Sequence, residues 1–126
     1  MAKSANLIYS RHFSITGVTT SGKETANLVG GSTRGVLDTM VIRKVSGSAS
    51  TVDIQVRLKT GNSNAEYLIY EATGESLSSP VRETAIGALF DTLSTDSDSD
   101  LYLYLDPDAS GTPNDFAVRL DFRIQQ

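Results

Sequence analysis

The chain has 126 residues, of which 39% are hydrophobic and 21% are charged, and its formal net charge is −4. This length predicts a single domain over residues 1–126, and the composition is that of a folded protein and not of a disordered one. The negative charge argues against a nucleic-acid partner, because phosphate backbones are bound by clustered Lys and Arg. The absence of cysteine excludes disulfides and thiolate metal sites.

The amino-terminal residues show no sign of a signal peptide or a membrane anchor. Residues 1–6 are small or polar apart from Met1 and the cation Lys3, and no apolar run long enough to span a membrane occurs in the sequence. We therefore expect no membrane partner and a product made in the cytoplasm. Residues 1–6 are expected to form a flexible N-terminal arm.

Apolar side chains recur at every second position along much of the chain, which is the pattern of β-strands with one face in a core. Between Val36 and Val45 both alternate positions are apolar, so this strand is predicted to be central and covered on both faces. The predicted strands are residues 7–15, 36–45, 52–58, 67–70, 101–105 and 116–124. Short strands separated by turn residues predict an all-β fold, an antiparallel β-sandwich.

Two short links rich in Gly, Ser and Asn separate neighbouring predicted strands. Each of them, Ser46–Ser50 and Thr60–Asn64, has the composition of a turn. Turns of this kind suit antiparallel hairpins. The sequence therefore predicts that both links connect strands that pair with each other.

One segment departs from the strand pattern. Ile86, Leu89 and Phe90 follow helical spacing, and a Ser-Pro pair upstream suits the start of a helix. Gly87 weakens this pattern. With strand as the competing interpretation, we expect one short helix near residues 80–93, crossing one end of the sandwich.

No pattern in the sequence predicts a catalytic site or a cofactor. The segment Gly17–Lys23 has the spacing of a phosphate-binding loop, but Glu24 stands where that loop needs Ser or Thr to hold Mg²⁺. His12 is the single histidine and is expected on a strand surface, which gives no support to a Ser-His-acid site. Paired carboxylates for glycoside hydrolysis depend on separation in space, which sequence does not show. We expect a protein that is not an enzyme.

Acidic residues gather in two segments, Thr92–Asp100 and Asp106–Asn114, which are expected to be exposed connections. The alternation of Asp96, Asp98 and Asp100 begins like a calcium loop, but the glycine and the final glutamate of that motif are missing. We therefore expect a solvated acidic rim and no bound metal. An irregular calcium site between the two segments is the alternative.

Tyr102 and Tyr104 are candidates for a contact surface. If the leucines of their strand enter the core, both rings point outward side by side. The alternative is that the amino-terminal segment or the region around Ile86 covers them. The candidate interface residues are Ala2, Lys3, Ser4, Ala5, Asn6, Tyr102 and Tyr104.

Four segments are characteristic in the order of their strands, the composition of the loops between them and their polarity. They are Asp38–Gly47, Thr51–Arg57, Asp100–Leu105 and Phe116–Ile124. In these features the chain resembles small β-sandwich virion proteins of tailed bacteriophages, over residues 36–124. The resemblance implies a jelly-roll-like fold that frequently trimerises. It also implies a capsid decoration or cement subunit that bridges neighbouring major capsid subunits.

We therefore expect a virion structural protein, a capsid decoration or cement subunit, that is located in the virion and assembled in the host cytoplasm. Its expected partners are the major capsid protein or another virion protein, and further copies of itself, with a homotrimer favoured. Two alternatives stay open. One is a structural protein of the head-tail junction, tail or fibre; the other is a carbohydrate- or receptor-binding module in which Tyr9, Tyr67 and Tyr70 stack on the ligand.

Overall fold

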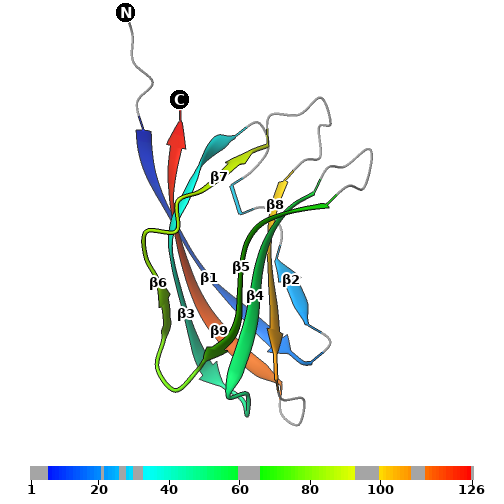
Figure 1. Cartoon of the computed structure of the whole chain (residues 1–126). Helices are drawn as coiled ribbons and strands as arrows, with labels where there is room; N and C mark the ends of the chain where they lie inside the picture. Colours follow the sequence, from blue (N-terminus) through cyan, green and yellow to red (C-terminus); the bar gives the residue numbers. More distant parts are fainter. Residues whose placement is uncertain are drawn as a thin grey trace, which may run out of the picture.

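The computed structural model describes residues 6–20, 22–25, 28–29, 33–59, 66–92, 100–108 and 113–125. In this part of the chain every regular element is a β-strand, and the strands form two facing antiparallel sheets (Figure 1). The strands are β1 (Asn6–Val18), β2 (Lys23–Thr25), β3 (Arg34–Ser46), β4 (Thr51–Lys59), β5 (Glu66–Ser76), β6 (Val81–Glu83), β7 (Ala88–Asp91), β8 (Asp100–Pro107) and β9 (Asn114–Gln125). The predicted antiparallel β-sandwich is confirmed.

The chain moves back and forth between the two sheets as it is followed from strand to strand. The first sheet has the order β1, β9, β3, and both β6 and β7 pair with the remaining edge of β3. The second sheet has the order β2, β8, β4, β5. This winding is that of a jelly roll. As predicted, β3 is a central strand, but it is not covered on both faces, since Val41 is half-buried and Val45 is exposed.

The core lies between the sheets and is built from alternate side chains of the strands. In β8, Leu101, Leu103 and Leu105 are fully buried. In β9, Phe116 and Leu120 are fully buried in the same way. The period-two pattern of the sequence therefore identifies the core-facing side chains of these strands correctly.

The link Ser46–Ser50 does not close a hairpin, contrary to the prediction. It connects β3 in the first sheet to β4 in the second sheet. Asn114 holds this crossing, because its Oδ1 accepts a hydrogen bond from the backbone N–H of Ala49 at 2.9 Å. The other predicted hairpin is supported by its flanking strands, since β4 and β5 pair antiparallel.

We expected a short helix near residues 80–93, and this prediction is wrong for residues 80–92, the part of the segment that the structure describes. This segment contains β6 and β7, which lie at the edge of the first sheet. Phe90 enters the core while Leu89 points to solvent, as in a strand, and the positive φ angles of Ala85 and Gly87 interrupt any helical turn. Pairing with the open edge of β3 outweighs a weak helical pattern. Nor does any described residue belong to a helix that could span a membrane.

Candidate functional site

Tyr102 and Tyr104 lie on the outer face of the second sheet, and both are half-buried. Cations of the neighbouring strand β4 cover their rings. Lys59 Nζ lies 4.5 Å from the ring centroid of Tyr102, and the guanidinium carbon of Arg57 lies 4.6 Å from that of Tyr104. These contacts are attractive because the ring face is electron-rich. The region around Ile86 does not cover the two tyrosines, because Ile86 packs against the core.

An ion-pair and hydrogen-bond network fixes the two cations. Glu24 Oε2 of β2 lies 2.5 Å from Lys59 Nζ and 3.9 Å from Arg57 Nη1. Gln55 accepts a hydrogen bond from Arg57 Nε at 2.7 Å and donates one to Glu71 Oε2 of β5 at 2.6 Å. Each such surface pair contributes less than about 1 kcal/mol. Together they make this face an ordered polar surface instead of a pair of bare aromatic rings.

Most of the predicted arm lies outside the described residues, so the interface role of Ala2, Lys3, Ser4 and Ala5 stays a prediction. Asn6 begins β1 and pairs through its backbone with Gln125 at the edge of the first sheet. Tyr102 and Tyr104 belong to the second sheet. The structure therefore does not join Asn6 and the two tyrosines into one patch.

The two acidic segments attach to opposite ends of β8. Asp100 begins this strand and is buried, and Asp106 lies six positions later, about 20 Å along an extended chain. Asp108 accepts hydrogen bonds from the backbone N–H groups of Thr51 and Ser50, and these bonds lower the pKa of Asp108. No described residues form a group of His, Asp or Glu that could hold a metal ion. Asp96 and Asp98 lie outside the described residues, so the irregular calcium site between the two segments stays a prediction.

The structure describes a carboxylate pair, His12 and the ends of the Gly17–Lys23 segment. The carboxyl groups of Glu75 and Glu83 are hydrogen-bonded to each other, and burial together with this bond raises the pKa of Glu75. Glycosidases hold their two carboxyl groups about 5 to 9.5 Å apart, so this direct contact leaves no space for a sugar. His12 is exposed on β1, as predicted. Gly17–Lys23 leads from β1 into the strand β2 and not into a helix.

The three tyrosines considered for sugar stacking do not share a surface. Tyr9 belongs to β1 in the first sheet and stacks on Phe122 with ring centroids 6.1 Å apart. Tyr67 and Tyr70 belong to β5 in the second sheet; Tyr70, like Tyr9, packs against the core, whereas Tyr67 is 54% exposed. These three rings therefore provide no common stacking platform.

The outer face of the first sheet carries a second polar network around Asp121. The carboxylate accepts hydrogen bonds from Ser10 Oγ at 2.7 Å, Thr39 Oγ1 at 2.6 Å and Arg119 Nε at 3.1 Å. Burial alone would raise the pKa of Asp121, but these bonds outweigh it and hold the pKa below its ordinary value. The network joins β1, β3 and β9 across their outer face.

One end of the sandwich collects exposed apolar side chains. Among the described residues, the large hydrophobic side chains that are more than half exposed at this end are Leu7, Ile8, Tyr67, Leu68 and Leu89. They surround the end where β1 and β5 begin and β9 finishes (Figure 1). Val45, also more than half exposed, lies at the opposite end, where β3 finishes. We name the first group the apolar end.

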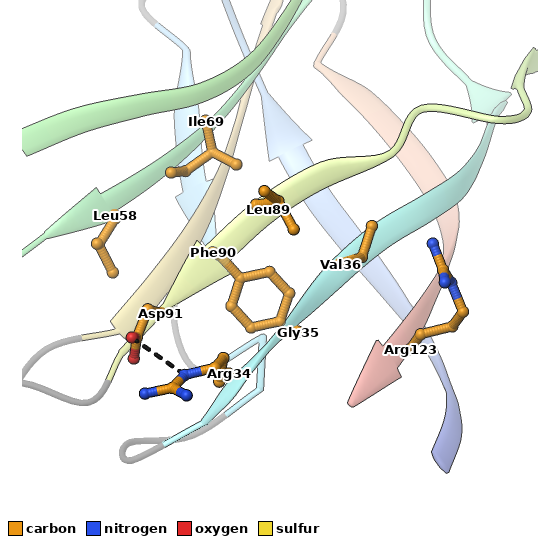
Figure 2. Close-up of a pocket in the computed structure, with 9 residues that line it drawn as sticks. All are labelled: Arg34, Gly35, Val36, Leu58, Ile69, Leu89, Phe90, Asp91 and Arg123. Atoms are coloured by element: carbon orange, nitrogen blue, oxygen red, sulfur yellow. Dashed lines mark hydrogen bonds and ion pairs between the residues drawn. The ribbon is translucent and has the colours of Figure 1, made fainter. Parts of the chain in front are cut away.

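A pocket of about 570 Å³ opens at the apolar end, between the two sheets. Figure 2 shows Leu58 and Ile69 of the second sheet on one side and the strand β7 with Leu89 and Phe90 on the other. Its lining residues are Arg34, Gly35, Val36, Leu58, Ile69, Leu89, Phe90, Asp91 and Arg123. Aliphatic and aromatic side chains of both sheets thus form most of its wall.

The charged residues at the pocket are paired with each other or with their neighbours. Arg34 Nε lies 3.3 Å from Asp91 Oδ2 (Figure 2), and Arg123 makes a bidentate pair with Asp38, with Nη2 3.0 Å from Oδ1. This pair raises the pKa of Arg123. Because each guanidinium has a carboxylate partner, the pocket carries no net charge from these groups. It is suited to an apolar side chain more than to an anion.

Sequence reasoning missed the pocket because its outer wall lies in the segment interpreted as a helix. Read as a strand, Ala88, Leu89 and Phe90 alternate, and Leu89 falls on the solvent side. A large apolar residue on the solvent side of a strand indicates a contact surface where other exposed apolar side chains lie near it. That signal becomes visible only when the segment is assigned as β.

No protein-family model matches the chain, and no curated protein matches it either. Among solved structures, it is similar to a chain in the structure of infectious bursal disease virus, Gt strain, with 12% identity and a TM-score of 0.55 over 95% of this chain and 32% of that one. A chain in the structure of the Gx strain gives 9% identity and a TM-score of 0.42 over 94% of this chain and 32% of that one. The chain therefore spans about a third of the length of these matched chains. The first likeness shows a shared fold.

Proposed function

We propose that this chain is a structural protein of a virus particle, located in the virion, and more specifically a capsid decoration or cement subunit. The observation that supports the proposal is the likeness of its fold, over nearly its whole length, to a chain of a virus structure. The proposed role depends on binding alone. It requires no bond-making chemistry, no cofactor and no metal.

The proposed partner is a shell protein, and the proposed contact is the part of the apolar end around the pocket, with Tyr67, Leu68 and Leu89. Covering exposed apolar surface contributes about 25 cal/mol per Å². The pocket beside Leu89 would receive an apolar side chain of the shell protein, since its own charges are already paired. A contact of standard size buries about 800 Å² on each partner, and the symmetry of a shell repeats it many times. The subunit would stabilise the shell by this added interface.

Co-sedimentation with empty shells of the virus that encodes the chain tests the proposal. The wild-type protein should pellet with the shells at a fixed ratio. Leu89→Lys places a charge at the mouth of the pocket, on a side chain that is 76% exposed, so the fold should be unaffected and binding should fall at least about tenfold, or about 1.4 kcal/mol.

Val45→Lys is the matched control, because Val45 is 58% exposed at the opposite end of the sandwich. It should bind shells as the wild type does. Equal binding by the two variants would contradict the apolar end as the contact. If the wild-type protein pellets with isolated tails and not with shells, the chain is a tail protein and the proposed capsid role is wrong.

A further inference from the structure

The edges of the two sheets differ in how well they are protected against a further strand. Natural sheets protect their edges with short strands, bulges and charged side chains. β2 and β6 have three residues each, and β7 has four. β5 has eleven, but its register against β4 shifts twice, and its sequence carries Glu66, Glu71 and Glu75 and no Lys or Arg. These edge strands are therefore poor templates for pairing.

β1 is the least protected of the edges, because its one charged side chain is Arg11 and its register shift lies beyond Ile15. It is 13 residues long, and Asn6 to Ile15 pair with β9 without interruption; the register shifts only beyond Ile15. The strand contains no proline, no Asp and no Glu. Among the described residues no strand pairs with its other edge. A long, regular and acid-free edge of this kind is suited to accept another strand.

The side chains of β1 show the same incomplete coverage as its backbone edge. On the core-facing side the exposure falls from 52% at Leu7 to 2% at Ile15, and Tyr9 and Phe13 between them are half-buried. On the outer side Ile8 is 68% exposed. A strand placed beside β1 would cover this apolar surface as well as completing the sheet.

We infer that β1 pairs antiparallel with β1 of a second copy of this chain, about a two-fold axis at Ser10. The first sheets of the two copies then form one continuous sheet with a shared core side. Leu7 lies beside Phe13 of the second copy, and Tyr9 lies beside Arg11 of the second copy. Both are favourable cross-strand pairs, one apolar and one of a cation with an aromatic ring.

The register follows from charge and from the regular length of β1. Two-fold antiparallel pairing keeps core-facing residues beside core-facing ones, so the axis passes through a residue position. An axis at Arg11 would oppose Arg11 to its own copy, and like charges repel. An axis at Tyr9 shortens the paired stretch to residues 6–12, and one at His12 carries it past the register shift beyond Ile15. An axis at Ser10 pairs residues 6–14.

The size of this contact sets the concentration at which it should be seen. Nine paired residues make an edge about 30 Å long. An interface of this extent falls at the small end of specific contacts, where weak and transient complexes are found. We therefore expect dissociation in the micromolar range. Sedimentation velocity of the purified chain, from about 1 to 200 µM, should show a monomer that converts to a dimer.

Disulfide cross-linking tests the register, because the chain has no cysteine of its own. Ser10 and Ser14 are both exposed on the outer face of β1. Ser10→Cys places the two thiols opposite each other, with Cβ atoms about 5 Å apart, whereas Ser14→Cys separates them by about 27 Å. Under mild oxidation the Ser10 variant should cross-link at least about tenfold faster than the Ser14 variant.

Equal cross-linking rates, the discrete homotrimer that the resemblance to phage virion proteins favours, or a monomer at every concentration would each overturn the inference. No shell protein is present in either experiment. Failure to bind shells would therefore contradict the proposed function and leave the β1 contact standing, and failure to cross-link would do the reverse.

Discussion

At the scale of single residues, Asn114 holds the chain where it crosses between the two sheets. Its side chain is fully buried. Oδ1 accepts the N–H of Ala49 at 2.9 Å, and Nδ2 donates to the carbonyl oxygen of Val18 at 3.2 Å. Gly47 lies against it with φ of +114°, and a Cβ at that position would overlap the amide. One amide thus joins the end of β1, the start of β9 and the link between β3 and β4.

Asn114→Ala should lower the free energy of unfolding by about 3 kcal/mol, because it leaves two buried backbone groups without partners at about 1 to 3 kcal/mol each. Asp115→Ala is the neighbouring control. Its carboxylate accepts exposed hydrogen bonds from Gly17 N at 3.0 Å and Ser46 Oγ at 3.1 Å, so that variant should lose less than about 1 kcal/mol. Urea unfolding measures both, and similar losses would contradict the special role of Asn114.

The burial of Asn114 shows what local sequence does not reveal. The residue closes a segment that reads as an exposed connection, since Asn, Asp, Gly and Pro are typical of loops. Its partners Ala49 and Val18 lie 65 and 96 positions away in the chain. Composition within a short window predicts that such a residue belongs to a turn. It does not show which distant backbone groups need its amide.

At the scale of elements, the long strands were predictable, the short edge strands were not, and strand pairing was predictable only in part. The alternation over residues 52–58 identifies β4 because one face of that strand enters the core. The link Ser46–Ser50 has hairpin composition, yet β3 and β4 belong to different sheets. A turn composition shows that the chain reverses and not which edge receives the next strand. For β7 the local pattern predicted the wrong element. Its apolar residues have helical spacing, but the segment pairs with the edge of β3 and forms a strand.

Gly35 tests how closely β3 and β9 approach each other. A Cβ at this position would overlap the backbone carbonyl oxygen of Arg123, so Gly35→Ala must force the two strands apart. We expect a loss of about 3 kcal/mol in the free energy of unfolding. Gly74→Ala is the matched control in β5. Its φ is +62° and nothing lies within 4 Å of the added Cβ, so it should cost about 1 kcal/mol of backbone strain.

Thermal and urea unfolding of the two glycine variants distinguish the effect of a steric overlap between β3 and β9 from the effect of backbone strain alone. If the close approach of the strands matters, the Gly35 variant is the less stable of the two although its φ is ordinary. An equal loss in both would mean that β9 shifts without cost.

At the scale of the whole molecule, the two sheets share one core, and the sequence pattern identified its members well. Leu103 of the second sheet and Leu120 of the first are both fully buried in the same cluster. Neither sheet can bury its apolar face without the other. The surface was less predictable, because the apolar end forms only where residues far apart in sequence, such as Leu7, Tyr67 and Leu89, come to the same end of the sandwich.

Because the two sheets share one core, a destabilising core substitution in one sheet should lower the stability of the other sheet to the same degree. Leu103→Ala and Leu120→Ala should each lower the free energy of unfolding by about 2 to 5 kcal/mol through lost burial and a residual cavity. In hydrogen-exchange mass spectrometry, both variants should lose amide protection in β4 and in β3 to a similar degree, because opening is cooperative. Leu68→Ala, at an exposed position, should leave protection unchanged. Loss confined to the sheet that carries the substitution would mean that the two sheets unfold independently.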